Sequence, residues 1–165
     1  MARKTLNTSS QQRIVLGVGA GPCGLGLLRE ILARQPSARF SLDQAPLLPW
    51  TVRSEAALIE RRIDRWKATA HERLIGDAAA FYLPYAEAAI AHEPEIRIVC
   101  LRRSRDEVVA AFAQFLNDNS PLPINHWARA PAPDWNHDPL WTPTFPQYET
   151  RDRAAGIGRY WDEYY

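Results

Sequence analysis

The segment made of residues 13–35 constrains the fold more than any other part of the chain. It opens with RIVLGV (Arg13–Val18), a short apolar run typical of a buried strand. The run leads into GAGPCGLG (Gly19–Gly26), after which four apolar residues recur at helical spacing: Leu27, Leu28, Ile31 and Leu32. A strand, a glycine-rich turn and a helix in this order open an α/β fold. We therefore expect a three-layer α/β domain with a largely parallel sheet and helices on both faces.

Two further apolar runs predict strands. They are ARFSLD (Ala38–Asp43) and IRIVCL (Ile96–Leu101), and between them APLLPW (Ala45–Trp50) predicts a proline-bounded turn. The long stretch from Ser120 to Gln147 has a different character, because it holds seven prolines together with Trp127, Trp135 and Trp141. A loop of this length inside a compact domain is often a lid or a binding loop. The alternative is a wrapped extension whose tryptophans cover the core.

Helices are predicted where apolar residues recur every three or four positions. One amphipathic helix is expected from Val52 to Leu74, with Gly76 as its C-terminal stop. A short strand or turn should follow, and then a helix over residues 84–92 with proline in its first turn. Ser104 and Glu107 fit a capping box, so a helix should begin just after Ser104, and the final residues 151–165 also have a helical pattern.

Composition and charge indicate one ordinary globular domain. Of the 165 residues 46% are hydrophobic, and the net charge is +1, so we expect no general attraction to nucleic acid or membranes. Residues 1–12 are expected to be a disordered lead-in to a single domain formed by residues 13–165. These first residues lack the apolar centre of a signal peptide, so a reducing cytoplasmic location is expected. The two cysteines and four histidines lack metal-ligand spacing, and no metal is expected.

The glycine-rich turn is the strongest candidate for a binding site. It follows a predicted strand and opens a predicted helix, and in that setting backbone amides can hold a phosphate or another anion. The alternative is a tight turn that binds nothing. The candidate cofactor-binding residues in the turn are Gly19, Ala20, Gly21, Pro22, Cys23, Gly24, Leu25 and Gly26.

Two familiar motifs match this turn in part. Gly19 and Gly24 have the Walker A spacing, but Leu25 and Gly26 stand where that motif has Lys and Ser/Thr, so hydrolysis of ATP or GTP is not expected. The glycines also match the GxGxxG fingerprint of dinucleotide-binding folds, and Asp43 ends the second predicted strand where a ribose-binding carboxylate belongs. A Rossmann-type domain that binds NAD or FAD is therefore one alternative.

The sequence IRIVCLRRSRDEVVAAF resembles the element with which sulfotransferases hold the 3′-phosphate of 3′-phosphoadenosine 5′-phosphosulfate (PAPS). The family has an arginine at the end of a strand and a serine eight positions later. Arg103 matches the arginine, and Ala111 then stands in place of the serine. With Arg102 as the matching arginine, Ala110 takes that place. Arg105 and the start of the helix are further candidates for holding the phosphate.

Other segments resemble one bacterial-type branch of the sulfotransferase family and occur in the same order. They are QAPLLPW, GDAAAFYLPYAEAAI, NHW, FPQY and IGRYWDEYY, and with the turn they span residues 17–165. This resemblance implies a P-loop NTPase-like fold, with PAPS bound at the turn. Known relatives of this branch continue beyond the last segment, so the chain is expected to be C-terminally truncated or divergent.

The chain departs from the family at three places. Pro22 stands where relatives carry Arg or Lys, and Leu25–Gly26 replaces a helix start that bears Ser or Thr. Leu42–Asp43 stands where relatives often have His–Glu. A cation, a hydroxyl and a base of the family are therefore changed in this chain.

Sulfuryl transfer requires a base that accepts the proton of the attacking hydroxyl or amine. Asp43 is the first candidate and His126 the second, and the loop that holds Trp127, Trp135 and Trp141 could form the acceptor pocket. We therefore expect a PAPS-dependent sulfotransferase with an unidentified small-molecule acceptor and no metal. The alternatives are the Rossmann-type binder and a degenerate, non-catalytic domain that binds a nucleotide or serves in assembly. An exposed sheet edge would favour a homo-oligomer.

Overall fold

A computed structural model describes residues 12–50, 55–129 and 133–165 of the chain. The expected disordered lead-in lies outside the described residues apart from Gln12, whose side-chain amide donates to the carbonyls of Ala70 and Glu72. The predicted start of the long helix at Val52 also lies outside them.

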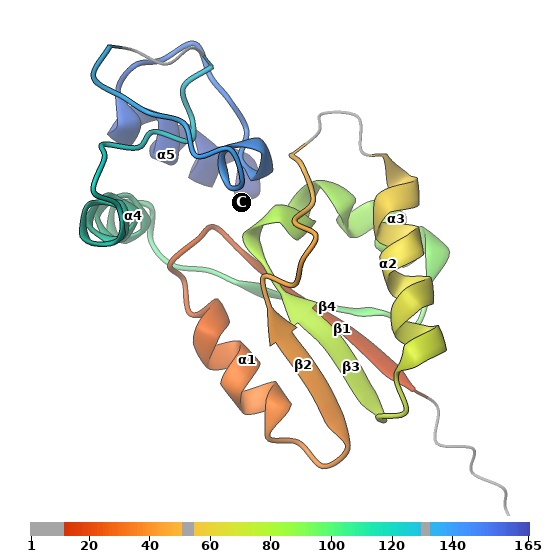
Figure 1. The fold of residues 1–165 in the computed structure, drawn as a ribbon. Coiled ribbons are helices and arrows are strands. Elements are labelled where there is room, and N and C mark those ends of the chain that lie inside the picture. Colours follow the sequence, from red (N-terminus) through yellow and green to blue (C-terminus); the bar gives the residue numbers. More distant parts are fainter. Residues whose placement is uncertain (1–11, 51–54, 130–132) are drawn as a thin grey trace, which may run out of the picture.

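The described residues form a four-stranded parallel sheet with the order β2-β3-β1-β4 (Figure 1). The strands are β1 (Arg13–Gly19), β2 (Ala38–Leu42), β3 (Leu74–Ala78) and β4 (Arg97–Leu101). The expected α/β class with a parallel sheet is confirmed. In this order β3 separates β1 from β2, whereas the classic dinucleotide-binding order places β2 beside β1. Strands β2 and β4 form the edges of the sheet, and the expected self-association through an edge stays a prediction.

Alternation of side chains along β1 divides the core between the two faces of the sheet. Ile14, Leu16 and Val18 belong to the larger core, which lies on the face that the second and third helices cover. Val15 lies on the other face with Leu25 of the first helix. Figure 1 shows the first helix on one side of the sheet and the next two on the other. These helices are α1 (Leu25–Ala33), α2 (Ala56–Thr69) and α3 (Ala86–His92).

Gly17 brings α1 close to the sheet. A Cβ atom at this position would lie 2.7 Å from Leu28 Cδ2 and 2.8 Å from Ala78 Cβ. Helix and strand can therefore approach this closely only because β1 lacks a side chain at position 17.

The predicted helix that continued to Leu74 is wrong at its C-terminal end. Helix α2 ends at Thr69, and Leu74 begins β3. Gly76 is not a helix stop but lies within β3, where a Cβ atom would collide with the carbonyl oxygen of Val15. Ala70 and Leu74 continue the helical spacing by coincidence. The strand LIGDA has few β-formers, and its pairing with β1 and β2 overrides the local pattern.

Proline also falls at a different place than expected in the next helical segment. Pro84 lies inside a 3₁₀ helix, η1 (Ala80–Tyr85), and α3 begins only at Ala86. The short strand or turn expected after Gly76 overlaps β3 only at Asp77 and Ala78, and η1 occupies most of the residues that follow.

The C-terminal third packs two helices together, α4 (Arg105–Asn119) and α5 (Arg153–Tyr164). Helix α4 begins directly after Ser104 as predicted, but the Ser104 side chain caps no backbone amide and its hydroxyl instead donates to the Glu107 carboxylate at 2.5 Å. The predicted C-terminal helix is confirmed in α5. Its N-cap is Asp152, whose Oδ1 accepts from the amides of Ala154 and Ala155.

The Pro- and Trp-rich loop joins α4 to α5 and includes a short 3₁₀ helix, η2 (Thr142–Thr144). Its three tryptophans have different surroundings. Trp127 is fully buried and packs against Phe112 and Phe145, so this part of the loop covers the core. Trp135 lies beneath the Arg153 guanidinium, and Trp141 is half-buried.

No helix among residues 12–50, 55–129 and 133–165 has the length and apolar character that a membrane crossing requires.

Candidate functional site

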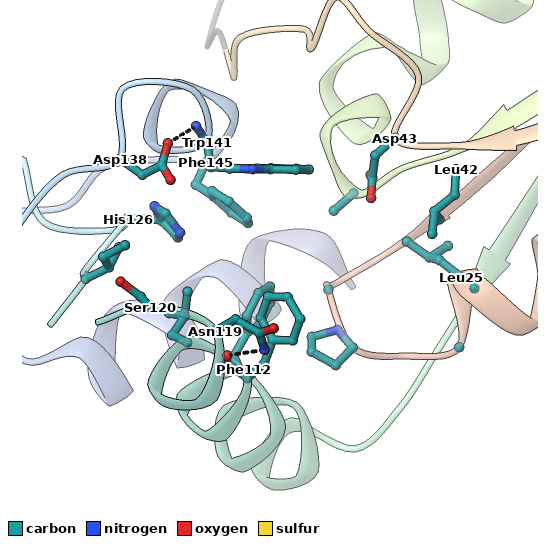
Figure 2. Close-up of a pocket in the computed structure, with 18 residues that line it drawn as sticks. Leu25, Leu42, Asp43, Phe112, Asn119, Ser120, His126, Asp138, Trp141 and Phe145 are labelled. Atoms are coloured by element: carbon teal, nitrogen blue, oxygen red, sulfur yellow. Dashed lines mark hydrogen bonds between the residues drawn. The ribbon is translucent and has the colours of Figure 1, made fainter. Parts of the chain in front are cut away.

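A pocket of about 500 Å³ opens where β1 and β2 end, and Figure 2 shows the residues around it. Open α/β sheets bind ligands at this end of their strands. Asp43 lies on one side of the pocket, and His126, Trp141 and Phe145 lie on the other (Figure 2). The described residues that line it come from the turn, the end of β2, η1, α4 and the long loop: Gly21, Pro22, Gly24, Leu25, Gly26, Leu42, Asp43, Ala80, Phe112, Phe115, Leu116, Asn119, Ser120, Ile124, His126, Asp138, Trp141 and Phe145.

The pocket brings together three parts of the predicted site. Five residues of the turn, the candidate base Asp43 and the second candidate His126 all line it, although they are far apart in the sequence. The other three predicted turn residues, Gly19, Ala20 and Cys23, are not in its lining.

Most amides in the first half of the turn already have partners. The Gly19 amide donates to the Tyr164 hydroxyl at 2.9 Å, and the Ala20 amide donates to the Tyr165 hydroxyl at 3.2 Å. The amide of Gly21 donates to the carbonyl of Gly19 within the turn. Pro22 has no N–H. This half of the turn is therefore satisfied by the protein itself.

The second half of the turn begins α1 and is more open. Cys23 Sγ lies over Gly19, burial raises the pKa of its thiol to about 11, and the Leu25 backbone donates to it. The amides of Gly24 and Gly26 have no hydrogen-bond partner among the described residues. They lie at the N-terminus of α1, where the helix dipole favours negative charge. An anion at the turn would therefore bind at Gly24–Gly26.

Asp43 follows β2 and holds an unusual backbone conformation. Its φ is 50°, in the left-handed region, and its amide donates to the Ala78 carbonyl at 2.9 Å. Asp and Asn tolerate this region better than most residues. The Asp43 carboxylate makes no hydrogen bond with another described residue. Burial, followed by the nearby charge of Asp77, raises the pKa of the Asp43 carboxyl to about 6, so it can exchange a proton near neutral pH.

Asp77 at the end of β3 is a buried residue that the sequence did not reveal. Its side chain is fully buried, and its Oδ2 accepts from the Gln44 amide at 3.0 Å and the Tyr82 hydroxyl at 2.8 Å. Behind Tyr82, the buried Arg62 donates to the Tyr82 hydroxyl at 2.6 Å. Oδ1 of Asp77 has no partner among the described residues, and burial raises the pKa of this carboxyl. The only sequence signal for Asp77 is an acidic residue directly after Gly76, where the local pattern predicts the end of a helix.

His126 is buried in the wall of the pocket. Its Nδ1 lies 3.0 Å from the Thr142 hydroxyl, and its ring stacks on Phe145 with centroids 5.0 Å apart. Burial lowers the pKa of His126 to about 4. The imidazole is therefore neutral at pH 7 and adds no positive charge to the pocket.

The predicted 3′-phosphate residues do not line the pocket. Arg103 is exposed and donates to the carbonyl of Pro22 at 3.0 Å, so its guanidinium lies against the turn from outside. Arg105 forms an ion pair with Asp162 of α5 at 3.1 Å. Ala111 is a half-buried residue on α4. Only Arg103 among these three contacts the turn.

The aromatic wall of the pocket differs from the predicted one. Trp141 lines the pocket as expected, but Trp127 belongs to the core and Trp135 does not line the pocket. Phe112 and Phe115, from helix α4, and Phe145 supply the other phenyl rings. The sequence also missed Asp138, whose Oδ1 accepts from the amides of Leu140 and Trp141 at 2.8 and 3.0 Å.

The charges that line the pocket are acidic. Two carboxylates, Asp43 and Asp138, face it, and among the described lining residues there is no Lys or Arg. Within the described parts of the chain, no group of His, Cys, Asp and Glu side chains is arranged to hold a metal ion.

Comparisons of the chain with protein-family models, with curated proteins and with solved structures gave no match.

Proposed function

We propose that the protein is a sulfotransferase-like enzyme that binds PAPS at the glycine-rich turn and transfers its sulfuryl group to a small-molecule hydroxyl or amine. The observation that carries this proposal is that the turn and Asp43, which the sequence resemblance selected separately, line one pocket with an aromatic wall. A phosphate-binding turn, a base and an apolar acceptor wall are the parts that this chemistry needs.

Each part has a defined role in the transfer. A lone pair of the acceptor attacks the sulfur, the S–O bond to the nucleotide phosphate breaks, and its electrons leave with the phosphate as adenosine 3′,5′-bisphosphate. The Asp43 carboxylate takes the proton that the acceptor loses. The free amides of Gly24 and Gly26 stabilise negative charge on the phosphate or sulfonate oxygens at the end of α1.

Arg103 adds a cation at the edge of the turn. Its exposed side chain donates to the Pro22 carbonyl and lies 3.8 Å from the Glu107 carboxylate, and an exposed ion pair of this kind is weak enough for the guanidinium to turn toward a phosphate. The strand order supports a phosphate-loop domain over a dinucleotide-binding one, because β3 rather than β2 lies beside β1.

A second candidate function is a non-catalytic binding domain. Two observations favour it: the first amides of the turn are occupied by the Tyr164 and Tyr165 hydroxyls, and the described lining of the pocket lacks a cation. A polyanionic nucleotide is held less strongly under these conditions.

Calorimetric titration with adenosine 3′,5′-bisphosphate decides between these functions, with AMP, NAD and FAD as comparators. The proposal expects micromolar binding that needs the 3′-phosphate and weakens about tenfold or more in Arg103→Ala. The matched control is Arg97→Ala, because Arg97 is exposed at the start of β4 and does not line the pocket. No binding of the bisphosphate would reject the sulfotransferase and favour the non-catalytic domain, and binding of NAD or FAD instead would favour a dinucleotide protein.

A further inference from the structure

The acceptor side of the pocket carries an unneutralised negative charge. The Asp43 carboxylate faces the pocket, and no described residue gives it a hydrogen bond or an ion pair. Asp138 adds a second carboxylate on the opposite wall, and His126 is neutral at pH 7. An acidic pocket of this kind favours a ligand that brings positive charge.

The rest of the pocket lining is apolar and aromatic. Trp141 and Phe145 lie across from Asp43, and Phe112 extends from α4 (Figure 2). Aromatic faces attract cations, and their rings also bury the apolar body of a ligand. A volume of about 500 Å³ holds a molecule of one or two rings.

Resting on the sulfotransferase function above, we propose that the acceptor is an amine: a primary ammonium group on an apolar or aromatic body, with the ammonium paired to Asp43 and the body against Trp141 and Phe145. A neutral alcohol of the same shape fills the aromatic part but leaves Asp43 without a partner. A carboxylate of the same shape is repelled by Asp43 and Asp138.

The transfer to an amine requires the loss of two protons. The bound ammonium first gives one proton to Asp43, which passes it to solvent and frees the nitrogen lone pair. The lone pair attacks the sulfur, the N–S bond forms, and the S–O bond breaks with its electrons leaving on the nucleotide phosphate. Asp43 then takes the second proton, and the product is a sulfamate.

The test compares three probes of one shape at pH 7.5, without nucleotide: 2-phenylethylamine, 2-phenylethanol and 3-phenylpropanoate. The whole chain is titrated by calorimetry or by chemical shift. We expect the amine to bind at least about tenfold more tightly than the alcohol, and the carboxylate to bind most weakly. Equal affinities for amine and alcohol, or tightest binding of the carboxylate, would overturn the inference without any variant.

The variant Asp43→Asn assigns the preference to one side chain. Asn keeps the shape of the side chain and tolerates the left-handed backbone at this position. The amine should lose its advantage of about tenfold, while the alcohol binds as before. Asp118→Asn is the matched control, because it removes one exposed carboxylate of α4 that does not line the pocket. A preference that survives in Asp43→Asn would contradict the inference.

These results separate the inference from the proposed function. Preference for the amine without binding of adenosine 3′,5′-bisphosphate would keep the cation-binding pocket and reject the sulfotransferase. Binding of the bisphosphate without preference for the amine would keep the sulfotransferase and reject the amine as its acceptor.

Discussion

Asp77, fully buried at the end of β3, is the charged neighbour that helps to raise the pKa of the pocket residue Asp43 at the end of β2. The two strands are adjacent and parallel, so their carboxyl ends meet at one edge of the sheet. Tyr82 and the Gln44 amide donate hydrogen bonds to Asp77, whereas Asp43 lines the pocket.

Replacing Asp77 with Asn should therefore change the titration of Asp43. The substitution removes the like charge but not the burial, which is the larger cause. The pKa of Asp43 should fall from about 6 toward, but not to, its ordinary value of 3.8. Carboxyl ¹³C chemical shifts across a pH titration measure this change. Asp118→Asn should leave the pKa of Asp43 unchanged, and an unchanged value in Asp77→Asn would refute the coupling.

The Asp43 carboxylate should make folding less favourable at neutral pH. Its folded-state pKa is raised, so the unfolded state loses this proton first as the pH increases from 3.8 to about 6. The stability that the protonated Asp43 carboxyl contributes is fully present below pH 3.8, and it is lost as the pH rises through about 6. Asp43→Asn should increase the free energy of unfolding at pH 7.5 by about 1–2 kcal/mol, a figure reduced for partial exposure.

Urea unfolding at pH 7.5 and at pH 4 checks this effect. The variant and the natural chain should differ at pH 7.5 and converge at pH 4. The charged and titratable neighbours around Asp43 are Asp77 behind it and Asp138 and His126 across the pocket. A difference that is the same at both pH values would mean that the charge of Asp43 is not its cause.

The two C-terminal tyrosines should contribute unequally to stability. The Tyr164 hydroxyl is buried between the Gly19 amide and the Ala80 carbonyl, at 2.9 Å from each. Tyr164→Phe leaves both groups without a partner and should cost about 1–3 kcal/mol. The Tyr165 hydroxyl also joins two backbone groups, the Ala20 amide and the Leu101 carbonyl, but Tyr165 is only half-buried, so Tyr165→Phe should cost only about 0.5–1.5 kcal/mol. Thermal or urea unfolding measures both, and the reverse order would argue against this account.

Two glycines of the turn should respond in opposite ways to alanine. Gly21 has φ 69°, and a Cβ atom there would collide with the Phe112 ring, so Gly21→Ala should cost about 2–4 kcal/mol. At Gly26 a Cβ atom would have no neighbour within 4 Å, and the residue lies in the first turn of α1. Gly26→Ala should therefore stabilise the protein by about 0.5–1 kcal/mol. Denaturant midpoints compare them, and similar losses at both sites would contradict the turn geometry.

Local sequence was sufficient for the elements with a strong and continuous pattern. The buried strand Arg13–Gly19, its glycine-rich turn and the helix after Ser104 follow from the spacing of apolar residues over a few positions. Position at the end of a predicted strand was also enough to select Asp43 as a candidate.

Tertiary structure alone decided the features that depend on distant contacts. Strand β3 forms because two neighbouring strands pair with a weak segment, and this pairing buries Asp77. Trp127 lies in the core, Trp141 lines the pocket and Trp135 packs under Arg153, because each contacts residues distant in the sequence. The sequence alone determined the α/β order and the turn, since these depend on near neighbours. The acidic pocket and the occupied amides arise from residues brought together across the fold, which no local pattern records.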